Sequence, residues 1–102
     1  MFLFKKVPSI SAQELEQLLT KPIELIDVRS PMEFSGGHIP KAKNVPLDKI
    51  QTYKPKGKVY VVCQSGPRSK RAVQYLTSQG VDAYNIEGGM MRWTGKVKMG
   101  DK

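Results

Sequence analysis

A chain of 102 residues with 39% hydrophobic side chains is long enough for a modest core, and we expect residues 1–102 to form one domain. No apolar run approaches the roughly 18 residues of a membrane span, and Met1–Phe4 is too short for the apolar part of a signal peptide. A single cysteine permits no intramolecular disulfide, which suits the reducing cytoplasm. One cysteine and one histidine are too few to bind a metal ion well. We therefore predict no metal, and no other cofactor is predicted.

The net charge of +8 arises from 17 lysines and arginines that are scattered along the chain. The densest group is Arg68, Lys70 and Arg71. Because no RNA-binding signature or aromatic platform accompanies these residues, nucleic acid is not a predicted partner. We expect a solvated basic surface to account for most of the charge, and the dense group to attract a small anion by long-range steering.

Strand and helix patterns alternate along the chain. A Ser11-x-x-Glu14 capping box, with Ile10 and Leu15 spaced as a hydrophobic staple, predicts the start of the first helix. In chain order we expect strands over residues 4–7, 23–28, 43–46, 59–62 and 82–86, and helices over 12–19, 30–34, 47–53, 68–79 and 90–93. This alternation predicts one α/β domain with a mainly parallel sheet.

In a parallel sheet, ligands bind beyond the carboxyl ends of the strands. Three such ends carry polar or reactive residues, namely Asp27–Arg29, Cys63 and Glu87–Gly89. We therefore expect these segments to meet at one edge of the sheet.

Cys63, the only cysteine, stands where the apolar strand 59–62 gives way to a helix. The first amides of a helix have no intrahelical partner and carry the positive end of its dipole. A thiol placed there, with Arg68 nearby, is predicted to have its pKa lowered from about 8.5 into roughly the 3.5–7.5 range. The alternative is a small buried hydrophobe. The glycine, proline and arginine that follow favour a reactive, partly exposed thiol.

Motifs over nearly the whole chain resemble the single-domain rhodanese family of thiosulfate or persulfide sulfurtransferases. In order these are Ile26-Asp27-Val28-Arg29, Glu33-Phe34, Gly37-His38-Ile39-Pro40 with Ala42 and Asn44, Cys63-Gln64-Ser65-Gly66-Pro67-Arg68-Ser69, and Gly88-Gly89 with Trp93. Lys41 departs from the glycine that the family often has there. The resemblance implies a rhodanese-like fold, with a central, mainly parallel five-stranded sheet flanked by helices on both faces.

The resemblance also implies a ping-pong transfer of sulfane sulfur. Cys63 would attack a small anionic donor such as thiosulfate, and a thiol or cyanide would accept the sulfur from the Cys63 persulfide. Arg68 would bind the anionic end of the donor, as a second catalytic residue. The substrate-binding residues implied are those of the loop and the start of its helix: Gln64, Ser65, Gly66, Pro67, Arg68 and Ser69.

Alternatives remain at several positions. Four residues separate Cys63 from Arg68, whereas five separate the cysteine and arginine of related phosphatases and arsenate reductases. The shorter loop disfavours phosphate chemistry. A persulfide carrier that acts in a sulfur relay with a partner protein stays open. Asp27 and Arg29 could support the loop or form a local ion pair with Glu33.

Two other motifs are assigned structural roles. His38 is expected to lie in a structural turn. The Gly88–Gly89 pair is expected to make a turn rather than to approach the cysteine loop closely. Trp93 is expected to pack into the core beneath that turn.

Overall fold

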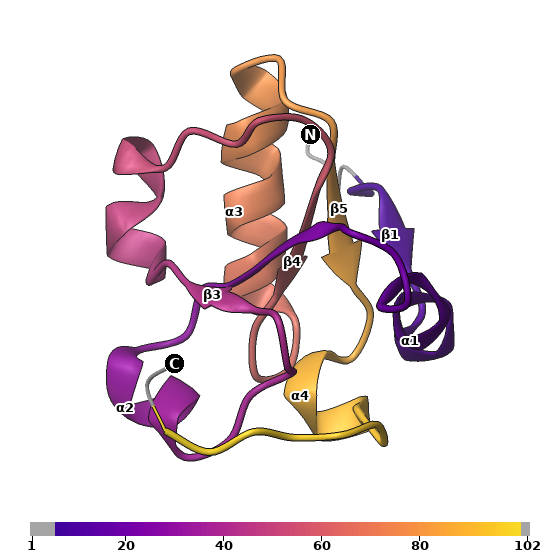
Figure 1. Ribbon diagram of the computed structural model, residues 1–102. Helices are drawn as coiled ribbons and strands as arrows, with labels where there is room; N and C mark the ends of the chain where they lie inside the picture. Colours follow the sequence, from indigo (N-terminus) through magenta and orange to yellow (C-terminus); the bar gives the residue numbers. More distant parts are fainter. Residues whose placement is uncertain (1–5, 101–102) are drawn as a thin grey trace.

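The computed structural model describes residues 6–100 and contains one five-stranded sheet (Figure 1). The strands are β1 (Ser9–Ile10), β2 (Glu24–Asp27), β3 (Lys43–Asn44), β4 (Val59–Val62) and β5 (Ala83–Ile86). They lie in the order β1-β5-β4-β2-β3, and every pairing is parallel. The predicted α/β class and the parallel sheet are therefore confirmed, with β4 at the centre.

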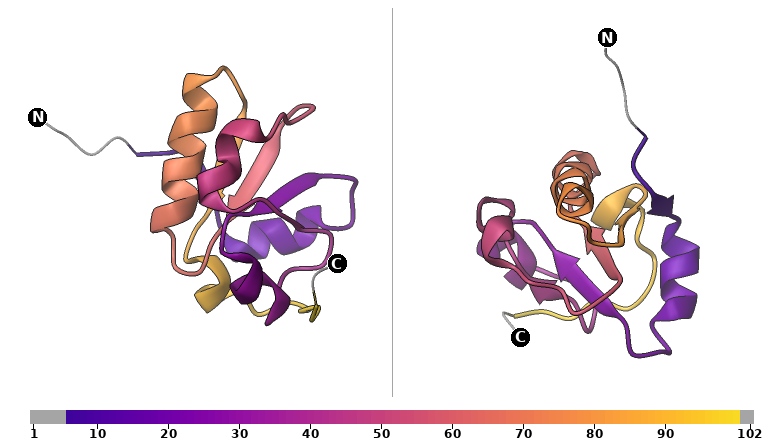
Figure 2. Two further views of the ribbon diagram at one scale, coloured as in Figure 1. Left: turned by 90° about the vertical axis from the view of Figure 1, so that its left-hand side faces the viewer. Right: turned by 90° about the horizontal axis from the view of Figure 1, so that it is seen from above.

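Helices cover both faces of this sheet (Figure 2). They are α1 (Ala12–Leu18), α2 (Pro31–Ser35), the 3-10 helix η1 (Leu47–Thr52), α3 (Pro67–Ser78) and α4 (Gly89–Arg92). Because side chains alternate along a strand, Val59 and Val61 pack in the cluster beneath α3, whereas Tyr60 and Val62 pack with Leu15 of α1 on the other face. The almost continuous apolar sequence of β4 is thus explained by burial on both sides.

The predicted helix starts are formed as capping boxes. Ser11 Oγ accepts a hydrogen bond from the Glu14 amide at 3.1 Å, and Glu14 Oε1 accepts one from the Ser11 amide at 3.0 Å. The same exchange joins Ser30 and Glu33 at the start of α2. The capping box predicted at Ser11 is therefore present, and the helix expected over residues 30–34 starts with a second one.

The first strand lies later in the chain than predicted. Of the expected strand 4–7, Phe4 and Lys5 lie outside the described residues, while Lys6 and Val7 precede the two-residue strand β1. Pairing with β5 determines this position, since the Asn85 amide donates to the Pro8 carbonyl at 2.8 Å and the Glu87 amide donates to the Ile10 carbonyl at 2.9 Å. The strand was predicted too early in the chain because the position of an edge strand this short depends on its pairing with β5 rather than on its own residues.

The C-terminal segment returns to α2 across the carboxyl edge of the sheet (Figure 1). His38 and Lys98 exchange backbone hydrogen bonds at 2.9 and 2.8 Å. The His38 ring is buried, stacks on Phe34 with centroids 3.7 Å apart, and its Nδ1 lies 2.9 Å from the Phe34 carbonyl oxygen. His38 therefore lies in an isolated antiparallel bridge with Lys98 rather than in the predicted turn, and its buried ring packs on α2. Within residues 6–100 no helix has the length and apolarity needed to cross a bilayer.

Candidate active site

The loop between β4 and α3, residues 63–66, lies at the carboxyl edge of the sheet, with α2 and α4 near it (Figure 1). We call residues 63–66 the active loop. The ends of β2 and β5 reach the same edge because all five strands run in parallel. The three chain segments that sequence analysis expected to meet there are thus brought together.

Cys63 is completely buried at the base of the active loop. Its Sγ lies 3.0 Å from the amide nitrogen of Gly66, which donates to it, and 3.3 Å from Ser69 Oγ. The expectation of a partly exposed thiol was wrong, because Cys63 continues the alternation of Val59 and Val61 and faces α3. The sulfur nevertheless contacts the helix start rather than apolar groups alone. Among the described residues, Gly66 supplies the backbone N–H bonded to it.

Gly66 gives the active loop its shape. Its φ of 128° lies in a backbone region that residues other than glycine rarely adopt, and Gly66 is the N-cap residue of α3. Pro67 follows at the first helical position, where its missing N–H breaks no helical bond. Glycine and proline together therefore turn the chain so that an amide faces the sulfur.

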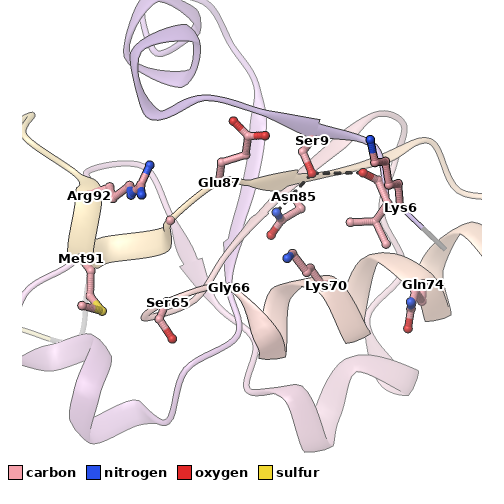
Figure 3. Close-up of a pocket in the computed structure, with 12 residues that line it drawn as sticks. Lys6, Ser9, Ser65, Gly66, Lys70, Gln74, Asn85, Glu87, Met91 and Arg92 are labelled. Atoms are coloured by element: carbon pink, nitrogen blue, oxygen red, sulfur yellow. Dashed lines mark hydrogen bonds between the residues drawn. The ribbon is translucent and has the colours of Figure 1, made fainter. Parts of the chain in front are cut away.

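A buried polar chain extends from the sulfur toward β1. Ser69 Oγ lies 2.9 Å from the Gly66 carbonyl oxygen and 2.5 Å from Asn85 Oδ1. Asn85 Nδ2 in turn donates to Ser9 Oγ at 3.3 Å (Figure 3). Sequence analysis did not single out Asn85. The available signal was an amide at an inward-facing position of an otherwise apolar strand.

Asp27 and Arg29 form a buried ion pair, in which Arg29 Nη2 lies 2.8 Å from Asp27 Oδ2. Arg29 also donates to Gln64 Oε1 at 3.3 Å and to the Gly37 carbonyl at 2.8 Å. The pair therefore contacts the active loop through Gln64 as well as bracing the end of β2. Glu33 is not part of it, contrary to the alternative considered from the sequence.

Glu33 pairs instead with Arg68. Two hydrogen bonds of 2.7 and 2.9 Å join the guanidinium to the carboxylate, and each side chain is 37% exposed. The hydrogen bond from Arg68, together with that from the Ser30 amide, lowers the pKa of Glu33 from 4.5 to about 2. The same pairing raises the pKa of Arg68. The predicted donor-binding cation thus already has a carboxylate partner.

The Gly88–Gly89 pair approaches the active loop closely, so the expectation of a turn alone was wrong. The amides of Met90 and Met91 donate to the carbonyls of Cys63 and Gln64 at 2.8 and 3.0 Å. A Cβ on Gly89 would stand 2.4 Å from the Cys63 carbonyl oxygen. Both glycines have positive φ, which lets α4 turn back onto the loop. The sequence could not reveal this contact between two distant loops.

Two further features complete the site. Trp93 packs against the core cluster that contains Leu15, as predicted, and its Nε1 donates to the Lys96 carbonyl at 2.9 Å. Within residues 6–100, no three His, Cys, Asp or Glu side chains are grouped so that they could hold a metal ion.

Comparison with known proteins assigns the family. The Rhodanese-like domain model matches residues 11–96. The chain is 47% identical over 83 residues to "Uncharacterized protein YqhL" of Bacillus subtilis, covering 74% of this chain and 64% of that protein. It is 36% identical over 94 residues to a protein named "Sulfurtransferase" of Allochromatium vinosum, covering 85% of this chain and 88% of that protein.

A solved structure agrees with these relatives. The crystal structure of a rhodanese-like domain protein from Staphylococcus aureus superimposes with a TM-score of 0.81 at 37% identity, covering 90% of this chain and 97% of that one. The parallel five-stranded sheet with helices on both faces is thus the rhodanese-like fold. The chain belongs to the rhodanese-like domain family.

Proposed function

We propose that the protein is a sulfurtransferase that moves sulfane sulfur from an anionic donor such as thiosulfate to a thiophilic acceptor through a persulfide on Cys63. The observation that carries this proposal is the position of Cys63 Sγ, 3.0 Å from the Gly66 amide at the start of α3. Membership of the rhodanese-like family supports it, as does the name of the Allochromatium vinosum relative.

The reaction has two steps, sulfur transfer from the donor to Cys63 and sulfur transfer from Cys63 to the acceptor. In the first, the Cys63 thiolate attacks the outer sulfur of thiosulfate; an S–S bond forms at Sγ, and sulfite leaves with the electron pair of the broken bond. In the second, cyanide or a thiolate attacks the outer sulfur of the persulfide, and the electron pair of the Cys63 S–S bond returns to Sγ. The nucleophile in this proposal is the thiolate, so no residue is assigned as its general base.

The loop would stabilise the sulfur anion through groups fixed before the reaction. The Gly66 N–H and the positive end of the α3 dipole both favour negative charge at Sγ. A preorganised donor of this kind typically contributes about 2.7–4 kcal/mol to transition-state stabilisation. Because Cys63 is covered, the donor reaches Sγ only after the surrounding side chains move. We further propose that Arg68 contacts the donor by exchanging Glu33 for it.

A second candidate function uses the same persulfide without independent turnover. The complete burial of Cys63 would protect a bound sulfur from water, which suits a persulfide carrier in a relay with a partner protein. The four-residue spacing from Cys63 to Arg68 argues against the wider loop of a phosphatase or arsenate reductase. The proposal places the protein in the cytoplasm, where its single thiol stays reduced.

Intact mass measurement after incubation with thiosulfate tests the proposal. We expect a gain of one sulfur atom that cyanide removes, and thiocyanate formation over many turnovers. Cys63→Ser is expected to lose both while keeping the thermal unfolding midpoint, because the serine hydroxyl still lies beside Gly66 and Ser69. Mass gain without turnover would identify a carrier. Thiocyanate formation by the Cys63→Ser variant would reject the mechanism.

A further inference from the structure

A groove of about 1210 Å³ lies beside the active loop (Figure 3). The active loop contributes Ser65 and Gly66 to its wall, and β5 contributes Asn85. Arg68 does not line it; that side chain faces a separate cavity of about 450 Å³. Pockets that bind drug-sized ligands occupy about 300–1,000 Å³, so this groove is far larger than thiosulfate requires.

The groove is positively charged. Lys6, Lys70 and Arg92 line it from three separate segments, whereas Glu87 is its single acidic residue. The salt bridges within residues 6–100 are Asp27–Arg29 and Glu33–Arg68, so no carboxylate of the described chain lies within salt-bridge distance of these three cations. Figure 3 shows the Lys70 ammonium pointing from α3 toward Asn85. The groove therefore offers positive charge that is not paired in a salt bridge within residues 6–100.

Arg92 is held at this position by the glycine turn. The stem of Arg92 lies so close over Gly88 that a Cβ there would stand 2.3 Å from Arg92 Cδ. Gly88 has a φ of 77° and directly precedes α4, and the amides of Met90 and Met91 in that helix donate to the active loop. The contacts that dock α4 on the loop thus also place a guanidinium beside the groove.

Two residues that line the groove, Gly66 and Asn85, are linked by hydrogen bonds to the nucleophile. Gly66 lines the groove, and its amide is the group 3.0 Å from Cys63 Sγ. A ligand held in the groove therefore lies next to the part of the active loop that covers the sulfur, and it reaches Sγ when the active loop and the side chains around Cys63 move. Exposed Met91 supplies an apolar surface for its hydrocarbon part.

We propose that this groove binds the sulfur acceptor, and that the acceptor is a peptide-sized thiol whose carboxylates contact Lys70, Arg92 and Lys6. This inference rests on the proposed function and specifies its acceptor. The acceptor thiolate attacks the outer sulfur of the Cys63 persulfide. A bond forms between those two sulfurs, the Cys63 S–S bond breaks, and its electron pair returns to Sγ. The product is the persulfide of the acceptor.

Glutathione, a tripeptide thiol with two carboxylates, and its diethyl ester are suitable probes, because they share one thiol and differ in charge. With thiosulfate as donor, we expect the wild type to have a KM about 5-fold lower for glutathione than for the ester. The Lys70→Gln/Arg92→Gln variant should lose this preference. Lys54→Gln/Lys56→Gln removes the same charge before β4, at the opposite edge of the sheet, and should retain it.

Binding is measured separately, so that the groove is tested even if sulfur transfer fails. We expect S-methylglutathione to shift the amide NMR signals of Ser65, Gly66 and Lys70 in the Cys63→Ser protein, with about 5-fold weaker binding after the Lys70→Gln/Arg92→Gln change. Equal KM values for the two probes in the wild type would overturn the inference. So would binding that the groove substitutions leave unchanged.

Discussion

The two sides of the active loop differ in whether their cationic side chains are paired with a carboxylate. On the α2 side, Arg68 is neutralised by Glu33 through two short hydrogen bonds. On the α4 side, backbone amides fix the loop, and Lys70 and Arg92 have no carboxylate within salt-bridge distance among residues 6–100. When backbone hydrogen bonds fix a loop, nearby cationic side chains can still bind a ligand. When an ion pair fixes it, the cation is already bound to a carboxylate.

The largest effect should follow from breaking the backbone contacts on the α4 side. Gly89→Ala would place a Cβ 2.4 Å from the Cys63 carbonyl oxygen at a φ of 58°. We expect the free energy of unfolding to fall by about 3 kcal/mol and sulfur transfer to be largely lost. Urea unfolding and thiocyanate assays measure both.

Gly80→Ala is the matched control. Its φ is 84°, but no atom lies within 4 Å of the added Cβ, so only backbone strain of about 1–2 kcal/mol is expected, with activity retained. Equal destabilisation by the two substitutions would show that the close contact between Gly89 and the Cys63 carbonyl does not contribute to stability.

Removing the cation on the α2 side should affect catalysis more than stability. In Arg68→Ala, we expect the KM for thiosulfate to rise about 10-fold, while the free energy of unfolding falls by less than about 1 kcal/mol because the ion pair is partly exposed. Arg71→Ala, at an exposed position of α3, is the control. Equal loss of donor use and stability would make Arg68 a structural clamp.

Removing only the carboxylate should have a smaller and opposite effect. Glu33→Gln keeps a side chain that can complete the capping box at the start of α2. Because Arg68 is then released, the KM for thiosulfate should fall about 3-fold. Steady-state kinetics at constant ionic strength measures this. A higher KM would mean that Glu33 orients Arg68 for the donor.

The smallest effect concerns acid stability. The pKa of Glu33 is about 2 in the folded protein and ordinarily 4.5, so its contribution is complete above pH 4.5 and is lost as the pH falls toward 2. Since the carboxylate is 37% exposed, solvent screening limits the contribution to about 1 kcal/mol or less. Urea unfolding from about pH 6 to about pH 3 should therefore show wild type and Glu33→Gln converging. A constant difference would assign the contribution to packing.

Local sequence patterns were sufficient for the elements after the first strand and for the place of Cys63 between β4 and α3. The continuous apolar run of Val59–Val62 and the Ser11 capping box depend on near neighbours, and the strand and the helix start that they predict are both present. The contacts of Glu33, Gly89 and Asn85 join segments far apart in the chain, and packing selects one partner among several of similar chemistry. Burial of Cys63 was missed because the glycine, proline and arginine that follow it were taken to indicate a reactive, partly exposed thiol.

The complete burial of Cys63 also has a chemical consequence for the resting protein. Peroxide and alkylating reagents react with a cysteine only as often as its surroundings open, so the thiol is shielded from irreversible oxidation between encounters with donor. The rate of Cys63 labelling by a bulky maleimide, relative to that in urea, would therefore report how often the loop opens.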